Sequence, residues 1–476
     1  LACRLATAYA LGLLSSTGPR LISILCLLGK RKLTLNAACL QLYAILRRAV
    51  GVHRFPAFCG ILIGGSTLLQ TPIKAFIVQV VCLIQIAPTS ANLRIAGLLA
   101  RFIAALVSAS VSFGLLNSGP PKSPSDKTGS REVDEATLGA SSLSRIDLAG
   151  RTMNLTLFSV IRALDIVMSS AWNRLSPENH PRFKTVSRNT PTMLFCLSAA
   201  TIMHAWFYSP SRLPQSYNTW ISAAAELDHR LLLALRHARY GTWVYGKDTG
   251  MAPLLGSMCR DYGLEERLGD PAQTVPIPCE LVHMGSGKSC EKHALVRFWR
   301  GCIFAAKMYA PLQLLVLVRH VRKKARPGNN LAGLTQPILL RTFSDMARSS
   351  AFLGAFISFF YYGVCLSRTR IGPKLFSAKS VTPQMWESGL CVLGGCLLCG
   401  TSILFEQPRK RLEILFFVLP RAAATWFPRR YLPENRWKEQ LAFTISTAVV
   451  LTTAQEDSGR VRGVLGNALH GILKTN

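Results

Sequence analysis

Charged residues are scarce in this chain of 476 residues: they make up 17% of it, with 24 Asp and Glu against 55 Lys and Arg. Soluble proteins carry about 25% charged residues. With 49% hydrophobic residues and a mean hydropathy of +0.27, the composition argues against a soluble globular protein. The apolar residues gather in blocks of about 17 to 25, long enough to cross a bilayer as helix. The sequence therefore predicts an all-α, polytopic membrane protein with about eight to ten hydrophobic spans.

Motifs of the common enzyme classes are also missing. The sequence contains no Walker phosphate loop, no dinucleotide-binding glycine fingerprint and no HExxH metalloprotease motif. Fourteen cysteines are present, but most lie inside apolar blocks, where cysteine behaves as a small hydrophobe and not as part of a secreted disulfide framework. We therefore expect no catalytic residues, no cofactor-binding residues and no enzymatic activity.

The net charge of +31 is concentrated at the ends of apolar blocks. Examples are "GKRK" at residues 29–32, "RHVRKKAR" at 319–326 and "PRKR" at 408–411. Basic residues beside a span reach anionic head groups and set its orientation. A nucleic-acid surface would instead need a basic stripe with interleaved aromatic residues. The predicted partner is a bilayer with anionic head groups, and nucleic acid is not expected.

One apolar block carries small residues on a single helical face: Ala100, Ala104, Ser108 and Ser112. Small residues four apart let two helices approach closely in lipid. Such faces predict close helix packing, and they are also candidates for contact with a second copy of the chain in a homo-oligomer.

Composition divides the chain into five parts. These are an N-terminal hydrophobic segment with an amphipathic helix (1–53), a first membrane repeat (54–207) that contains a disordered Pro/Ser/Gly loop (118–145), a loop-rich Cys/His insert (208–297), a second membrane repeat (298–430) and a C-terminal tail (431–476).

Two pairs of stretches suggest that the membrane repeats arose by duplication. "RFPAFCG" at 54–60 resembles "RSSAFLG" at 348–354, and "GRTMNLTLFSVIRA" at 150–163 resembles "RKRLEILFFVLPRA" at 409–422, in the same order. Internal duplication is common in membrane proteins that handle a substrate between their halves. We expect the helices that follow Arg54 and Arg348 to occupy equivalent places.

The insert ends in a cluster of possible metal ligands, Cys279, His283, Cys290 and His293, with the spacing C-x3-H-x6-C-x2-H. Four nitrogen and sulfur ligands suit tetrahedral zinc. The spacing differs from the usual zinc pairs, C-x2–4-C and H-x3–5-H. Two alternatives stay open: a disulfide between the two cysteines, and a packed polar turn without a metal. A catalytic Cys/His pair is disfavoured, because the sequence indicates no orienting third group.

The segment Pro278–Val318 resembles the cysteine-rich segment of the transmembrane protein 135 family, also called peroxisomal membrane protein 52. Cys279, His283, Cys290 and "YAPL" at 309–312 occupy the family's Cys, His, Cys and YxPL positions, and "HAWFYSPSRLPQSY" at 204–217 is similar to its aromatic, proline-rich stretch. The fit is best to fungal members and covers most of the chain, without 118–145 and the last fifty or so residues. The family is itself distantly similar to the inner-membrane protein-import channel family.

The resemblance implies a multi-pass protein of mitochondrial or peroxisomal membranes that acts in lipid handling and organelle dynamics, with no established catalytic residues. A second hypothesis is a transporter or channel with a path between the halves, which would need polar groups at mid-membrane. Its candidates are Gln70, Lys74, Gln79 and Gln85. A third is a membrane-bound acyl-transfer enzyme, for which His53 and His204 lack an evident partner in the sequence.

Overall fold

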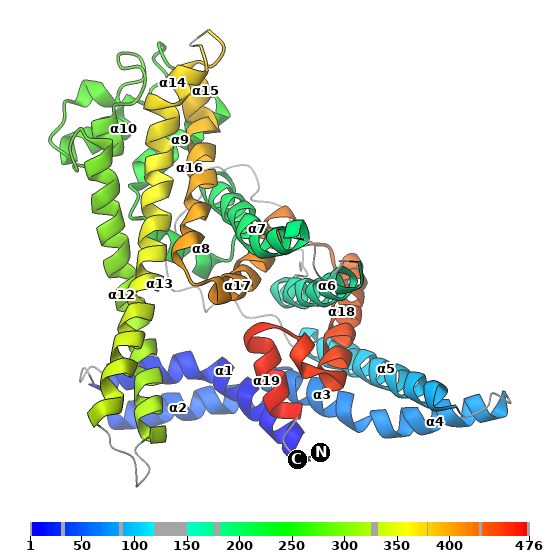
Figure 1. The fold of residues 1–476 in the computed structure, drawn as a ribbon. Helices are drawn as coiled ribbons and strands as arrows, with labels where there is room; N and C mark the ends of the chain where they lie inside the picture. The colour runs from blue at the N-terminus through cyan, green and yellow to red at the C-terminus, as the bar shows by residue number, and fades with distance from the viewer. Residues whose placement is uncertain are drawn as a thin grey trace. The chain divides into compact units, whose positions relative to one another are not determined.

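The computed structural model describes residues 2–29, 34–84, 89–118, 150–175, 181–324, 332–377, 379–427 and 431–473 (Figure 1). Over these ranges the chain forms helices and no strand, which confirms the all-α prediction. It divides into two compact units. One comprises Leu1–Asn179 and Pro428–Asn476, and the other His180–Phe427.

The first unit contains eight α-helices over its described residues: α1 (Ala2–Gly29), α2 (Leu35–Ala49), α3 (Phe55–Leu68), α4 (Gln70–Leu83), α5 (Ser90–Asn117), α6 (Met153–Leu175), α18 (Arg436–Glu456) and α19 (Gly463–Leu473). Helix α3 packs against α1 on one side and α5 on the other. Helix α18 packs against α5 and α6. The segment 431–476, expected to be a tail, thus supplies a central helix of this unit.

The small residues of α5 allow the close packing that their spacing predicts. Ala100, Ala104, Ser108 and Ser112 are all at most 2% exposed. A Cβ atom added to Gly65 of α3 would lie 2.5 Å from the Ser108 hydroxyl oxygen. This face of α5 is therefore occupied within the chain.

A buried carboxylate joins α6 to α18. Glu439, which is 7% exposed, accepts hydrogen bonds from the Thr152 and Thr156 hydroxyls at 2.8 and 3.0 Å and from the Tyr431 hydroxyl. Hydroxyl donors thus satisfy this buried carboxylate, and buried polar groups need such partners.

The second unit has four long helices and several short ones. The long helices are α7 (Pro181–Tyr208), α12 (Cys290–Lys324), α13 (Ala332–Cys365) and α17 (Pro408–Trp426); the shorter ones are α8 (Gln215–Ala225), α9 (His229–Tyr240), α10 (Ala252–Asp261), α11 (Cys279–Val282), α14 (Gly372–Leu375), α15 (Pro383–Met385) and α16 (Cys391–Cys399). A π-helical turn, Leu366–Arg370, follows α13, and another, Trp386–Leu390, precedes α16.

Glycines set the spacing of α13 from its two neighbours, α12 and α16 (Figure 1). Toward α12, a Cβ on Gly301 would lie 2.9 Å from the Cα of Gly354. Toward α16, a Cβ on Gly363 would lie 2.9 Å from the Cα of Gly395. At both contacts the backbones approach so closely that a methyl group would not fit without a shift.

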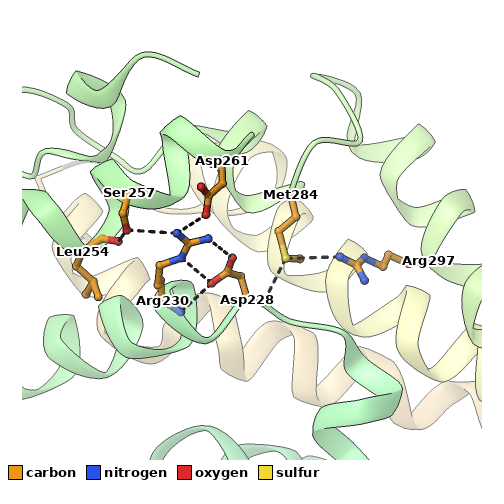
Figure 2. A network of polar contacts seen from close by, with 7 residues as sticks. All are labelled: Asp228, Arg230, Leu254, Ser257, Asp261, Met284 and Arg297. Atoms are coloured by element: carbon orange, nitrogen blue, oxygen red, sulfur yellow. Dashed lines mark hydrogen bonds and ion pairs between the residues drawn. The ribbon is translucent and has the colours of Figure 1, made fainter. Parts of the chain in front are cut away.

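The insert is more helical than expected, because residues 208–297 include α8 to α11 and enclose a core of their own. Trp243, Leu255, Met258 and Leu281 are at most 1% exposed in that core. At its surface, the Asp228 carboxylate caps α9 by accepting from the Arg230 backbone NH at 2.9 Å, and it also binds the Arg230 guanidinium (Figure 2). Burial alone would raise the pKa of Asp228, but these hydrogen bonds with Arg230 leave it below its ordinary value.

Five helical stretches of the described residues are long and apolar enough to cross a membrane: Phe55–Leu83, Ala91–Asn117, Met153–Ala171, Leu339–Leu375 and Pro383–Phe405. The expected number was eight to ten, and the five found here are those within the described residues. The segments expected to span at 193–207 and 412–427 are helical and long enough, in α7 and α17, but their hydropathy and charge leave them outside this set. The segment expected at 302–318 lies in α12, and part of it falls outside the residues whose side chains are described. Helix α17 is continuous, but charged side chains such as Arg409, Arg411 and Arg421 interrupt its apolar sequence.

Three expectations fall on residues outside the described ranges. These are the loop at 118–145 beyond Ser118, the polar residue Gln85, and the basic cluster at 319–326 beyond the end of α12 at Lys324.

Candidate functional site

Three side chains that could ligate a metal ion lie together where the insert contacts α13. His283 follows α11, Cys290 begins α12 and Cys365 ends α13. One donor atom from each lies within 4.8 Å of the other two. The Cys365 sulfur lies 3.6 Å from Nε2 of His283. All three belong to the second unit, so its own fold brings them together.

The backbone of the insert orients the His283 ring. Its Nδ1 lies 2.7 Å from the carbonyl oxygen of Gly287, and because a carbonyl only accepts, Nδ1 carries the hydrogen. Gly287 has a φ of +91°, a conformation that favours glycine, and it belongs to the turn that brings this carbonyl back to the ring. In the neutral ring Nε2 is then a lone-pair donor directed at Cys365. Burial lowers the pKa of His283, which favours this neutral form.

Cys279 stands beside this group. Burial raises the pKa of its thiol, the Arg368 guanidinium opposes that shift, and the neighbouring Cys290 thiol adds to it. Cys279 and Cys290 are both free thiols in the structure, so the disulfide that the sequence allowed is not formed here.

A buried ion pair borders the thiols. Arg368 lies in the π-helical turn after α13, and its guanidinium is 2.9 Å from Oε1 of Glu387; their side chains are 7% and 0% exposed. The same Glu387 oxygen accepts from the Ile277 backbone NH at 3.2 Å, which ties the segment before Cys279 to this pair. The Arg368 Nε–H has no hydrogen-bond partner among the described residues. A buried charge of this kind is costly unless it is paired.

His293, the fourth ligand suggested by the sequence, is not part of the group. Its ring stacks on His283 with centroids 4.7 Å apart and meets the edge of Tyr361 at 5.2 Å. It is 1% exposed, and within the described chain neither ring nitrogen makes a hydrogen bond of good geometry. Burial is the main cause that lowers the pKa of His293 to about 3, so the ring is a neutral packing element.

Sequence reasoning missed Cys365, Arg368 and Glu387. Cys365 stands in an apolar block and reads as a small hydrophobe, and 75 residues separate it from Cys290 in the chain. Arg368 reads as one of many cations at the end of a span. Only their fold-dependent proximity to the insert distinguishes them.

A buried residue at the edge of the site, Arg297, links the insert to α13. Its guanidinium lies over the Tyr361 ring at 4.7 Å, contacts the Met284 sulfur at 3.6 Å (Figure 2) and donates to the carbonyls of Ala225 and Glu226 at the end of α8. These contacts hold α8, α12 and α13 in place around the histidines.

The candidates for other chemistry make unrelated contacts. Nδ1 of His53 lies 3.1 Å from the Leu115 carbonyl oxygen, and the His204 ring packs against Tyr208. Among the transporter candidates, Gln70 donates to Gln455 at 2.8 Å, whereas Lys74 and Gln79 are exposed on α4.

The site as a whole is a sulfur-rich donor set beside a buried arginine, held by backbone hydrogen bonds and helix ends. Such a set can bind a soft or borderline metal ion. Comparison with known proteins does not add a relative: no protein-family model matches the chain, and no curated protein and no solved structure matches it.

Proposed function

We propose that this chain is a non-enzymatic, multi-pass protein of mitochondrial or peroxisomal membranes that handles lipids and takes part in organelle dynamics. The observation that carries the proposal is the apolar surface of the span Phe55–Leu83. Helix α4 buries none of its residues, and Phe76 and Leu83 are 65% and 81% exposed. Such a surface needs lipid to cover it. The resemblance to the transmembrane protein 135 family supports the organelle and the lipid role.

A duplicated architecture is part of this proposal, and matched glycines support it. Gly60 and Gly354 close the matched stretches "RFPAFCG" and "RSSAFLG". A Cβ on Gly60 would lie 3.5 Å from Tyr9 of α1, and a Cβ on Gly354 would lie 2.5 Å from the Cys302 sulfur of α12. Gly60 of α3 thus faces α1, from which α2 separates it in the chain, and Gly354 of α13 faces α12, which directly precedes it.

Matched aromatic contacts support it further. Phe58 and Phe352 hold the same place in these stretches. Phe58 packs on Phe443 of α18 with ring centroids 5.9 Å apart, and Phe352 packs on Phe195 of α7, also at 5.9 Å. Helix α18 follows the second membrane repeat in the chain but belongs to the first unit, and α7 closes the first membrane repeat but belongs to the second unit. We infer a duplication in which the two halves exchange these helices.

The second pair of matched stretches also makes matched contacts. Phe158 and Arg162 of α6 correspond to Phe417 and Arg421 of α17. In each helix the arginine lies over the ring of the phenylalanine four residues earlier, at 5.2 and 3.6 Å. Helix α6 packs on α18, and α17 packs on α7, which is the same exchanged arrangement.

Double-mutant cycles test the duplication. We expect Phe58→Leu with Phe443→Leu, and Phe352→Leu with Phe195→Leu, to show coupling energies of about 0.5–1.5 kcal/mol each, because each pair loses a ring contact. The measurement is unfolding of the purified protein in detergent. The control cycle pairs Phe58→Leu with Trp437→Leu, since Trp437 is on the same helix as Phe443 but 60% exposed. Coupling in only one unit would contradict the duplication.

Flux measurements test the function. We expect the protein, reconstituted in vesicles of neutral and anionic phospholipid, to speed the movement of a fluorescent phospholipid between leaflets or vesicles without releasing an entrapped small dye. Vesicles taken through the same procedure without protein are the control. Dye or metabolite release without lipid movement would favour the transporter, for which duplication is also common. If neither lipid nor solute moves, the lipid-handling proposal fails.

A further inference from the structure

We propose that Cys279, His283, Cys290 and Cys365 form a structural zinc site that fastens the insert to the end of α13. This inference does not depend on the proposed lipid function. It replaces the sequence-based ligand set, in which His293 stood where Cys365 now stands.

The distances fit tetrahedral zinc. With zinc–sulfur bonds of about 2.3 Å and zinc–nitrogen bonds of about 2.05 Å, a tetrahedron places sulfur and nitrogen ligands about 3.6 Å apart. The Cys365 sulfur and Nε2 of His283 are 3.6 Å apart. The Cys290 donor lies within 4.8 Å of both. One ligand–ligand distance thus matches tetrahedral zinc, and the third donor lies near enough for one ion to contact all three.

The histidine is also prepared for a metal. Zinc-binding imidazoles usually donate their second ring nitrogen to a carbonyl or carboxylate, which fixes the tautomer. The contact of Nδ1 with the Gly287 carbonyl does this for His283 and leaves the Nε2 lone pair free for zinc.

Cys279 is the proposed fourth ligand: its thiol hydrogen-bonds to that of Cys290, but it lies outside the three donors that are all within 4.8 Å of one another, so zinc would have to draw it in. Binding converts three thiols to thiolates, releases three protons to solvent and needs no oxidant or reductant. Zinc with three thiolates and a neutral imidazole carries a net charge of −1. The Arg368 guanidinium, which pairs with Glu387, lies beside these thiols, so the zinc site and Glu387 would share this cation.

Metal analysis of the full-length protein, purified with zinc and without chelator, tests the site. We expect about one zinc per chain in the wild type and less than about half in Cys365→Ser, because removal of one ligand of a structural site weakens binding strongly. Two matched controls should keep their zinc. Cys391→Ser changes a cysteine that is 1% exposed but outside the group, and His293→Phe keeps a ring stacked on His283.

A second measurement uses the wild-type protein, so its result does not depend on whether the variants fold. Cobalt exchanged into wild-type protein should give the intense near-ultraviolet band of thiolate–cobalt charge transfer, and zinc should protect the three cysteines from maleimide until a chelator is added. Three results would overturn the proposal: wild-type protein with less than about half an equivalent of zinc, Cys365→Ser with the wild-type zinc content, or a disulfide between Cys279 and Cys290 in the purified protein.

Discussion

Changing Glu387 to Gln should destabilise the second unit by about 3–5 kcal/mol, because the change leaves the Arg368 cation buried without its carboxylate. The two side chains are 0% and 7% exposed and 2.9 Å apart. The Ile277 backbone NH would keep an acceptor in the amide oxygen, so the loss should come mainly from the unpaired charge. Unfolding of the purified protein in detergent, followed by heat or denaturant, measures the loss.

A matched control lies two residues further along the same turn. Arg370 forms an ion pair with Glu291, and both side chains are about half exposed, at 53% and 50%. Arg370→Gln should leave stability close to the wild type, because water already solvates this pair. The double variant Arg368→Met with Glu387→Met should recover much of the loss. If Glu387→Gln and Arg370→Gln had the same free energy of unfolding, the buried ion pair would not contribute to stability.

Changing Gly395 to Ala should separate α13 from α16 and cost about 1–3 kcal/mol, since overpacking a tight interface forces the backbones to move. A Cβ at this position would lie 2.7 Å from the Phe360 carbonyl oxygen and 2.8 Å from Cγ2 of Val364. The carbonyl belongs to the backbone of α13 and has no freedom to rotate away. Thermal unfolding in detergent and cross-linking between the two helices measure the effect.

Gly97 of α5 is the matched control for this substitution. It also lies inside a helix of a candidate span, and a Cβ there would meet no atom within 4 Å. Gly97→Ala should therefore stabilise the helix by about 0.5–1 kcal/mol, because alanine loses less backbone entropy than glycine. Equal losses for both variants would mean that glycine at these positions matters through helix propensity and not through packing.

The helical class and the close packing of α5 were predictable from the sequence. Apolar blocks of spanning length have one stable form in lipid, since each backbone group must find its partner within the segment. Ala104 and Ser108 share a face because residues four apart lie above one another on a helix. Both features depend on local periodicity, which a single sequence displays directly.

The number of spans was less predictable, because hydropathy alone does not separate a helix that crosses lipid from one that is partly charged and packs beside others. Helix α17 shows this: "LEILFFVLP" reads as the core of a span, but Arg409, Arg411 and Arg421 share its helix. The sequence of such a helix does not indicate which other helix it packs against.

Part of the candidate site could be predicted from the sequence. Cys279, His283 and Cys290 stand within twelve residues, so their spacing alone suggested a donor set. The rest of the site depends on the tertiary structure. Cys365 and Arg368 reach it because glycines let α12 and α13 pack closely, and Glu387 reaches it through the turn before α16. Local spacing brings near neighbours together, whereas only the packing of whole helices decides which distant side chains share a buried place.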